Sequence, residues 1–222
     1  MRVVIAGAGG HARSVIEAVR NGRVELEPVA CTDPDPARAG SMLDGVPVVG
    51  GDEELGRLLA DGVEGACLGV GGVADNGPRA RLYERLRGLG FALPTVVHAS
   101  AVVASTAEIG AATQVLAGAI VGAGARIGEN VIVNTGAIVE HDCQIADHVH
   151  LATRCALGGG VRIGAGAHVG IGACVLQGVM VGPEAVVGGG AVVIRGVPPG
   201  TVVVGCPATA LVRGGEDLPP NL

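Results

Sequence analysis

The chain has 222 residues, a formal net charge of −6 and a pI near 5.5, and this length allows one large domain or two small ones. An acidic chain lacks the basic surface that phosphate backbones require, so nucleic acid is not expected as a partner. Forty glycines, one Tyr, one Phe and no Trp exclude a core of packed aromatic rings. All fifteen basic residues are arginines, which excludes Schiff-base and lysine-base chemistry.

The N-terminus runs from Met1 directly into an apolar strand pattern, without the basic and apolar regions of a signal peptide. No apolar run reaches the length of a membrane span. We therefore expect a cytoplasmic protein that does not enter a membrane. The six cysteines form no CxxC motif, which favours buried free thiols over a redox or zinc motif.

The first hundred residues alternate between strand and helix patterns. The segment RVVIAGAGG predicts a strand that ends in glycines, and residues 11–22 then have helical spacing and a glycine stop. Residues 24–33 and 64–72 predict two further strands, and residues 78–90 an amphipathic helix. The pattern predicts a small Rossmann-like α/β domain with a parallel sheet over residues 1–97.

The glycine turn from Gly7 to Ala12 matches the dinucleotide-binding pattern with alanine in its last place. Its backbone N–H groups are suited to hold a phosphate at a helix N-terminus. The domain supplies only about four strands, which favours a single nucleotide site over NAD. Asp33, at the end of the second strand, is a candidate for contacts to a base or ribose. A turn without any ligand is the alternative.

A hexad repeat begins at Val103, since every sixth residue from there to Val193 is aliphatic. Four residues after each stands a small or β-branched residue, from Ala107 to Ala191. This period predicts a parallel β-helix over residues 98–196, with three flat faces and coils of eighteen residues. The phase turns Cys143 and Cys155 inward as structural thiols. Residues 197–222 leave the hexad, and we expect a C-terminal extension with a loosely ordered, Pro- and Gly-rich end.

The hexad phase points several histidines outward. His141 stands between Glu140 and Asp142, while His150 and His168 are one coil apart and should stack on one outer edge. Gly159 lies one coil beyond His141 and should leave a bare strip for a thin ligand. The pattern predicts a groove, although an outward histidine between acids is also typical of a charged surface.

The Gly-Gly-His turn, the hexads, the segment NTGAIVEHDC and the terminal VVGCPA together resemble the NeuD/PglD-like family of sugar acetyltransferases. The resemblance covers almost the whole chain. It is nearest to the enzymes that N-acetylate nucleotide-linked 4-amino-6-deoxy sugars, such as those of the GDP-perosamine and UDP-bacillosamine pathways. It implies a left-handed β-helix, a homotrimer, acetyl-CoA as co-substrate, and a role in polysaccharide biosynthesis.

The resemblance also implies roles for individual residues. His141 would be the general base, oriented by Asp142 or Glu140, because a carboxylate on one ring nitrogen leaves the other free to accept a proton. A covalent route through the inward Cys143 is disfavoured. Acetyl-CoA would lie near His150, Gly159, Ile171 and Gly189, with the Gly159 N–H as an oxyanion donor. The nucleotide-linked amino sugar would contact Gly9, Gly10, His11, Asp33, Gly71 and Asn134.

Three other functions are weighed against this one. A sialic acid or other sugar O-acetyltransferase would have the same parts and a hydroxyl acceptor. A non-catalytic scaffold would use the β-helix only for assembly. Metal-dependent enzymes with hexapeptide helices also use outward histidines, but they depend on an HxxxxH pair that this sequence lacks, so no metal is expected.

Overall fold

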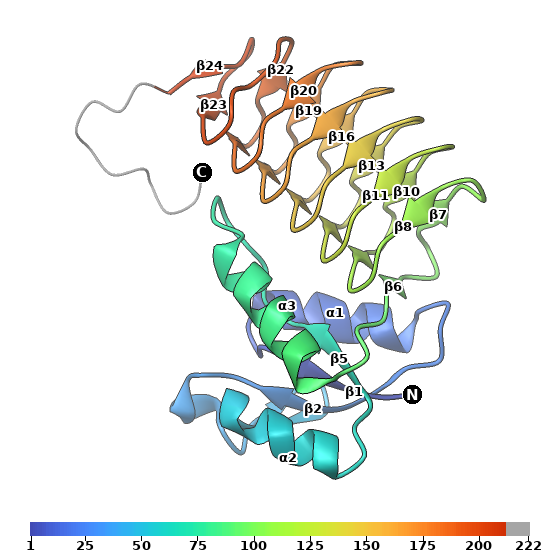
Figure 1. Ribbon diagram of the computed structural model, residues 1–222, viewed down its shortest axis with the longest axis vertical. Coiled ribbons are helices and arrows are strands. Elements are labelled where there is room, and N and C mark those ends of the chain that lie inside the picture. Colours follow the sequence, from blue (N-terminus) through green and yellow to red (C-terminus); the bar gives the residue numbers. More distant parts are fainter. Residues whose placement is uncertain (212–222) are drawn as a thin grey trace.

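A computed structural model describes residues 1–211 of the chain. It consists of an α/β domain at the N-terminus and a prism of stacked coils that follows it (Figure 1). No helix within residues 1–211 combines the length and hydropathy of a membrane span. The predicted fold class, a small α/β domain followed by a β-helix of hexads, is confirmed.

The N-terminal domain is built on one five-stranded sheet with the order β3-β4-β2-β1-β5. All neighbours pair in parallel except β3 and β4, which form an antiparallel hairpin. The hairpin and α2 were absent from the sequence prediction. The elements are β1 (Arg2–Ala6), α1 (Gly10–Arg20), β2 (Glu27–Thr32), η1 (Pro36–Arg38), β3 (Met42–Leu43), β4 (Val46–Gly50), η2 (Asp52–Glu54), α2 (Leu55–Ala60), β5 (Gly65–Leu68) and α3 (Gly77–Leu89).

The order of this sheet defines a switch point. The chain leaves β1 toward β2 on one side and later returns to β5 on the other side. In open parallel sheets, ligands bind at the carboxyl ends of the strands where the order reverses. Here those ends carry two glycine-rich loops, one from Gly7 to Gly10 and one from Gly69 to Gly72.

The prism has three faces of stacked two- or three-residue strands, each named after its first strand. The β6 face holds β6 (Val96–Val97), β9 (Gln114–Val115), β12 (Ile132–Val133), β15 (His150–Leu151), β18 (His168–Val169), β21 (Val186–Val187), β23 (Val202–Val204) and the antiparallel β24 (Thr209–Ala210). The β7 face holds β7 (Val102–Val103), β10 (Ile120–Val121), β13 (Ile138–Val139), β16 (Ala156–Leu157), β19 (Cys174–Val175) and β22 (Val192–Val193). The β8 face holds β8 (Glu108–Ile109), β11 (Arg126–Ile127), β14 (Gln144–Ile145), β17 (Arg162–Ile163) and β20 (Met180–Val181).

The core of the prism follows the hexad. Buried aliphatic residues from Val115 to Val193 alternate with small residues on the inner surface, as the repeat predicts. Cys143 and Cys155 are fully buried among them, and burial raises the pKa of the Cys155 thiol to about 12. Both cysteines are therefore structural, which confirms their predicted inward phase.

The turns between faces repeat one backbone conformation every six residues. The last turn residue has a positive φ from Ala112 to Gly190, and most of these positions are glycines. Asp142 is one of six other residues there, with φ 59°. Aspartate tolerates this left-handed conformation better than most residues, because its short polar side chain can hydrogen-bond locally.

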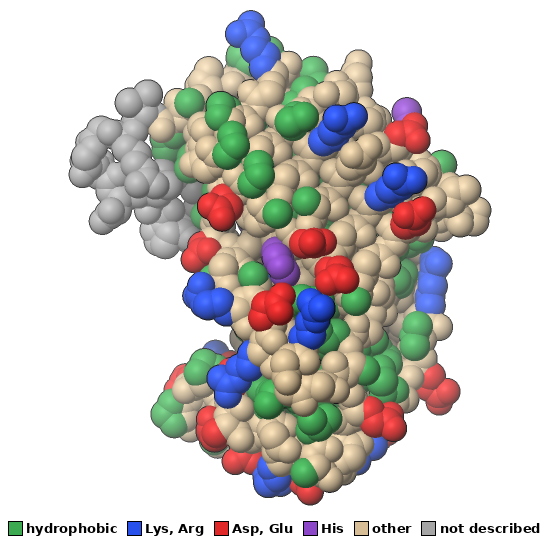
Figure 2. All heavy atoms as spheres, viewed as in Figure 1, with side chains coloured by type: hydrophobic (Ala, Val, Ile, Leu, Met, Phe, Trp, Pro, Cys, Tyr) green, Lys and Arg blue, Asp and Glu red, His purple; other side chains and the backbone are tan. Residues whose placement is uncertain are grey.

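The N-terminal domain packs on the β6 face, and α3 runs along the prism (Figure 1). Asn76, just before α3, donates hydrogen bonds of 3.0 and 3.1 Å to the carbonyls of Gly166 and Ala167. Farther along the helix, the Tyr83 hydroxyl donates to Glu129 at 2.5 Å. Charged side chains gather on the domain and the coils next to it, and fewer appear on the last coils (Figure 2).

The ends of the β-helix differ from the sequence prediction. Its first strand, Val96–Val97, pairs with β9 and so begins within the predicted N-terminal domain. At the other end, Val202–Val204 pairs with β21 and extends the β6 face. This strand forms outside the hexad, because a valine run can add a strand without keeping the repeat. The loosely ordered end was predicted for the Pro- and Gly-rich residues that follow. Residues 212–222 lie outside the described part.

Candidate active site

His141 lies in the turn between β13 and β14, on the edge shared by the β7 and β8 faces. Its side chain points outward and is 63% exposed, as its hexad phase predicts. The imidazole Nδ1 lies 2.9 Å from Asp142 Oδ2. Glu140 instead accepts the backbone N–H of His141 at 3.2 Å. In the structure, Asp142 and not Glu140 therefore contacts the imidazole ring of His141.

Two glycines make room for this pair. A Cβ at Gly124, one coil below, would lie 2.8 Å from Asp142 Oδ1. A Cβ at Gly159, one coil above, would lie 2.5 Å from His141 Nε2 and 2.6 Å from Cε1. The space over Gly159 is thus filled by the imidazole ring, and the expectation of a bare strip there is wrong. The ring fills it because His141 is the long side chain of the adjacent coil.

The hydrogen bond to Asp142 raises the pKa of His141, and the charges of Asp142 and Glu140 raise it further. Because a carboxylate accepts, neutral His141 carries its proton on Nδ1 and leaves the Nε2 lone pair free. This is the arrangement of a general base with an orienting acid.

We expect Asp142→Asn to move the acid limb of the pH–rate profile to lower pH. The base is active when His141 is unprotonated, and loss of the carboxylate lowers its pKa toward the ordinary value. The turn should persist because asparagine also tolerates positive φ. The profile of kcat/KM against pH measures the shift. Glu140→Gln is the matched control and should leave the limb nearly in place, and an equal shift in both variants would contradict the assignment.

A cavity of about 540 Å³ lies where the switch point of the sheet meets the edge between the β6 and β7 faces. It brings together Gly10, His11, Gly71, Asn134 and His150 from the sequence-predicted set. Ser14, Gly72, Val73, Thr135 and Thr153 complete its wall. We call this cavity the switch-point pocket.

Asp33 and Gly9 support the switch-point pocket without being among its lining residues. Asp33 Oδ2 accepts the N–H of Ala8 at 2.8 Å, which fixes the glycine turn to the end of β2. Gly9 is the N-cap of α1. Gly10 is the first helical residue, and a Cβ there would meet nothing within 4 Å. The N-terminus of α1 thus faces the pocket. There is open space around Gly10, and the free backbone N–H groups of the first turn are directed toward the pocket.

His11 is held by a residue that the sequence analysis missed. Its Nε2 lies 2.9 Å from the side-chain oxygen of Gln114, and the Gln114 amide donates to the carbonyl of Leu68 at 2.8 Å. Burial lowers the pKa of His11 to about 4, so the ring is neutral. Since an amide oxygen accepts, His11 carries its proton on Nε2. Gln114 shares the hexad phase of His150, which is the only sequence signal it offered.

His150 and His168 stack as predicted, with ring centroids 4.9 Å apart, but they are not on a solvent-exposed groove. They are 7% and 4% exposed, because the loop after β5 covers them. The Nδ1–H of His150 donates to the carbonyl of Gly72 at 2.6 Å, and Asn134 donates to its Nε2 at 3.1 Å. Burial lowers the pKa of His150 to about 3. The structure therefore places His150 in the wall of the switch-point pocket.

The residues expected to bind acetyl-CoA lie on two different edges. Ile171 is 62% exposed on the edge between the β6 and β7 faces, and a Cβ at Gly189 would lie 3.2 Å from its Cγ2. Gly159 is on the opposite edge of the β7 face, with His141. Within one chain, the switch-point pocket and His141 are therefore separated by the width of this face.

We expect Gly10→Val to raise the KM for a nucleotide-linked substrate by about tenfold or more. The open space at this position lets the side chain fit the fold while it blocks approach to the helix N-terminus. Steady-state kinetics measure the change, and the KM for acetyl-CoA is the internal control. An unchanged substrate KM would show that no ligand phosphate approaches Gly10.

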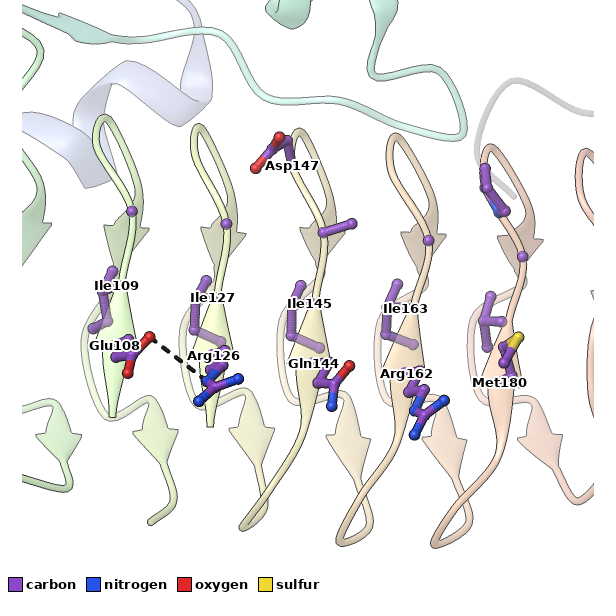
Figure 3. Close-up of a pocket in the computed structure, with 17 residues that line it drawn as sticks. Glu108, Ile109, Arg126, Ile127, Gln144, Ile145, Asp147, Arg162, Ile163 and Met180 are labelled. Atoms are coloured by element: carbon purple, nitrogen blue, oxygen red, sulfur yellow. Dashed lines mark ion pairs between the residues drawn. The ribbon is translucent and has the colours of Figure 1, made fainter. Parts of the chain in front are cut away.

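A larger cavity of about 670 Å³ lies on the β8 face (Figure 3). Its wall carries a row of outward side chains, among them Glu108 and Arg126, which form an ion pair of 3.6 Å. None of its lining residues is a histidine or cysteine. Size alone would favour this groove, but the acid–base pair and the glycine loops are elsewhere. Residues 1–211 contain no group of three or more His, Cys, Asp or Glu side chains placed to hold a metal.

Comparisons with known proteins find relatives that match nearly the whole chain. Residues 2–86 match the model of the PglD N-terminal domain, whereas the search of curated proteins finds no match. The H141A variant of GDP-perosamine N-acetyltransferase from Caulobacter crescentus, solved with CoA and GDP-perosamine, is 39% identical. The match covers 96% of this chain and 97% of that one, with a TM-score of 0.89.

The acetyltransferase domain of PglB from Neisseria gonorrhoeae is 33% identical, with a TM-score of 0.83, over 95% of this chain and 99% of that one. The same domain has been solved with acetyl-CoA, at 32% identity, 95% and 98% coverage and a TM-score of 0.81. Because such identity extends over both parts of the fold, this chain belongs to the NeuD/PglD-like family of sugar acetyltransferases, with its left-handed β-helix behind a small α/β domain.

Proposed function

We propose that the protein transfers the acetyl group of acetyl-CoA to the 4-amino group of a nucleotide-linked amino-deoxy sugar. The observation that carries this proposal is the His141–Asp142 pair, with Nδ1 held at 2.9 Å and Nε2 free. The similar enzyme from Caulobacter crescentus was solved with GDP-perosamine, and the histidine replaced in it carries the same number as His141. The switch-point pocket supplies the helix N-terminus that a nucleotide phosphate requires.

The chemistry follows from the free Nε2. The uncharged amine attacks the thioester carbonyl carbon and forms the C–N bond, and His141 Nε2 takes the proton that the amine loses. Collapse of the intermediate breaks the C–S bond, and the imidazolium returns the proton to the thiolate of CoA. Asp142 stabilises the imidazolium in between. The backbone N–H of Gly159 is the candidate donor to the oxyanion.

The active site would be shared between neighbouring copies in a homotrimer. The switch-point pocket and His141 lie on opposite edges of the β7 face. About six residues of extended chain cross this face, so the two edges are at most about 20 Å apart. The outward residues of this face are apolar, including Val102 at 60% and Ile120 at 39% exposure. Packing of this face against other copies would bury it. The edge of one chain that carries His141 would then lie beside the edge of the next chain that carries the switch-point pocket. Acetyl-CoA would then lie between them, against Gly159 of one chain and His150, Ile171 and Gly189 of the other.

A cytoplasmic role in polysaccharide biosynthesis would suit this activity, because nucleotide-linked sugars are the donors for glycan assembly. The free cysteines of residues 1–211, four of them buried, favour a reducing compartment. No nucleic acid or membrane partner is proposed.

The test of the function is a thiol-release assay with acetyl-CoA and a panel of GDP-, UDP- and dTDP-linked 4-amino sugars, with the product identified by mass. We expect one nucleotide class to give N-acetylated product. Acetylation of free sialic acid alone would replace the proposal with an O-acetyltransferase. Failure to bind acetyl-CoA would indicate a scaffold.

A mixing experiment tests the shared site. We expect that His141→Asn chains and Gly10→Val chains, each poorly active alone at low substrate concentration, regain activity when refolded or co-expressed together. In mixed trimers about one site in three combines an intact pocket with an intact His141 from the neighbouring chain. Each variant mixed with itself is the control. No recovery in trimers verified to be mixed would mean that the site lies within one chain.

A further inference from the structure

Arg79 is a buried charge that the acid–base site and the pocket wall leave unexplained. It lies in the first turn of α3 and is 1% exposed. A cation at a helix N-terminus is disfavoured by the helix dipole, and burial of an unpaired charge is costly. None of the ion pairs formed by residues 1–211 includes Arg79. A function of this charge would account for the energetic cost of its burial.

The guanidinium holds the loop that follows β5. Nη1 donates to the carbonyl of Val70 at 2.6 Å and to that of Leu68 at 3.3 Å. These two residues lead directly into Gly71 and Gly72, which line the switch-point pocket. Nε and Nη2 of Arg79 are buried without a hydrogen-bond partner among the described residues. The side chain thus has donor capacity that residues 1–211 do not use.

The Arg79 side chain is also connected to the wall of the switch-point pocket. The Leu68 carbonyl accepts from both Arg79 and Gln114, and Gln114 contacts His11, so a buried network joins Arg79 to the pocket wall. After burial, the charge of Arg79 is the next cause that lowers the pKa of His11. It lowers the pKa of His150 as well. Burial lowers the pKa of Arg79 itself to about 9, so it remains charged at neutral pH.

We propose that Arg79 is a positioning residue of the nucleotide site, which fixes the Gly69–Gly72 loop and supplies the positive charge that a substrate diphosphate neutralises. This inference rests on the proposed nucleotide-sugar substrate. The pocket wall itself contains no Lys or Arg. A diphosphate bound in the pocket would contact the N–H groups of α1. The charge of Arg79 would lie on the far side of the Gly69–Gly72 loop. The low-dielectric surroundings would make that charge effective at a distance.

The experiment separates charge from anchoring. Arg79→Gln keeps a side-chain donor and removes the charge, whereas Arg79→Lys keeps the charge. The probes are whichever of GDP, UDP or dTDP binds the wild type most tightly, and its uncharged nucleoside. We expect Arg79→Gln to weaken the diphosphate by about tenfold or more and the nucleoside by much less. Arg79→Lys should stay within about threefold of the wild type for both probes.

Controls exclude a general loss of structure. Arg81→Gln removes the same charge from an exposed position of the same helix and should change nothing. Acetyl-CoA affinity and thermal unfolding report on the fold, and Arg79→Met replaces Arg79→Gln if the latter does not fold. The pKa of His11, followed by NMR, should rise in Arg79→Gln and not in Arg79→Lys. A merely structural role would not produce this pattern.

Two results overturn the inference. One is an unchanged diphosphate affinity in folded Arg79→Gln, and the other is an equal loss of diphosphate and nucleoside in that variant. Failure of the proposed function has a different signature, because the wild-type protein would then bind acetyl-CoA but none of the three diphosphates.

Discussion

His141→Asn should lower kcat by about 10² to 10⁴ while the affinity for acetyl-CoA stays nearly unchanged. The free Nε2 of His141 is the only group in its turn suited to take a proton from an attacking amine, because the neighbouring Asp142 is occupied by Nδ1. Asparagine preserves a polar side chain at this outward turn position. Steady-state thiol release measures kcat, and calorimetry measures acetyl-CoA binding.

Gln177→Ala is the matched control for this substitution. Gln177 occupies the same turn position two coils farther along the same edge. Its replacement should leave kcat within a few-fold of the wild type. A His141→Asn protein that retains its kcat with a good substrate would remove the histidine from the mechanism and leave positioning alone to account for the rate.

Gly159→Ala should lower kcat on the order of a hundredfold, because the new Cβ would occupy the place of the His141 ring, 2.5 Å from Nε2. The backbone at Gly159 does not have a positive φ, so alanine introduces no backbone strain. The same turn position holds Ala123 two coils earlier on the same edge, which shows that alanine suits it. The loss is therefore expected in catalysis and not in stability. Kinetics and thermal unfolding on the same protein check both parts.

A double-mutant cycle sharpens this prediction. In a His141→Ala background the ring is absent, so Gly159→Ala should then cost nothing further. Equal losses in both backgrounds would mean that the new Cβ acts independently of the ring, for instance by blocking the approach of the thioester oxygen to the backbone N–H, which alanine retains. That outcome would favour the oxyanion role of Gly159 over its role in seating His141.

The hexad determined the inner surface of the β-helix from sequence alone. Only residues at two phases of the repeat can face inward, so Val103, Cys143 and Cys155 were placed correctly by counting. The same count placed His141 on the outer surface. Its partner Asp142 is its chain neighbour, although only the structure showed that Asp142 and not Glu140 contacts the ring. Local period and adjacency suffice where the contact itself is local.

The glycine turn was likewise readable from the sequence, because a tight turn between strand and helix has a local requirement for small residues. The short strands β3 and β4 and the added strand β23 were not. Each of these strands pairs with neighbours along its sheet, and none of them follows the hexad or the longer strand patterns of the first domain. Strand formation there is decided by the neighbouring strand and not by the segment.

Only the tertiary structure decided how the two parts meet. His150 lies under Gly72, 78 residues away, and Gln114 contacts His11 across 103 residues. Arg79 is buried where α3 packs against the end of β5, on the carbonyls of Leu68 and Val70, and nothing in the sequence around it indicates that burial. The hexad repeat leaves open which outward residues solvent reaches, because covering them depends on a domain folded from a distant segment. Burial then sets the protonation of His11 and His150, so their chemistry followed from the docking and not from the motif.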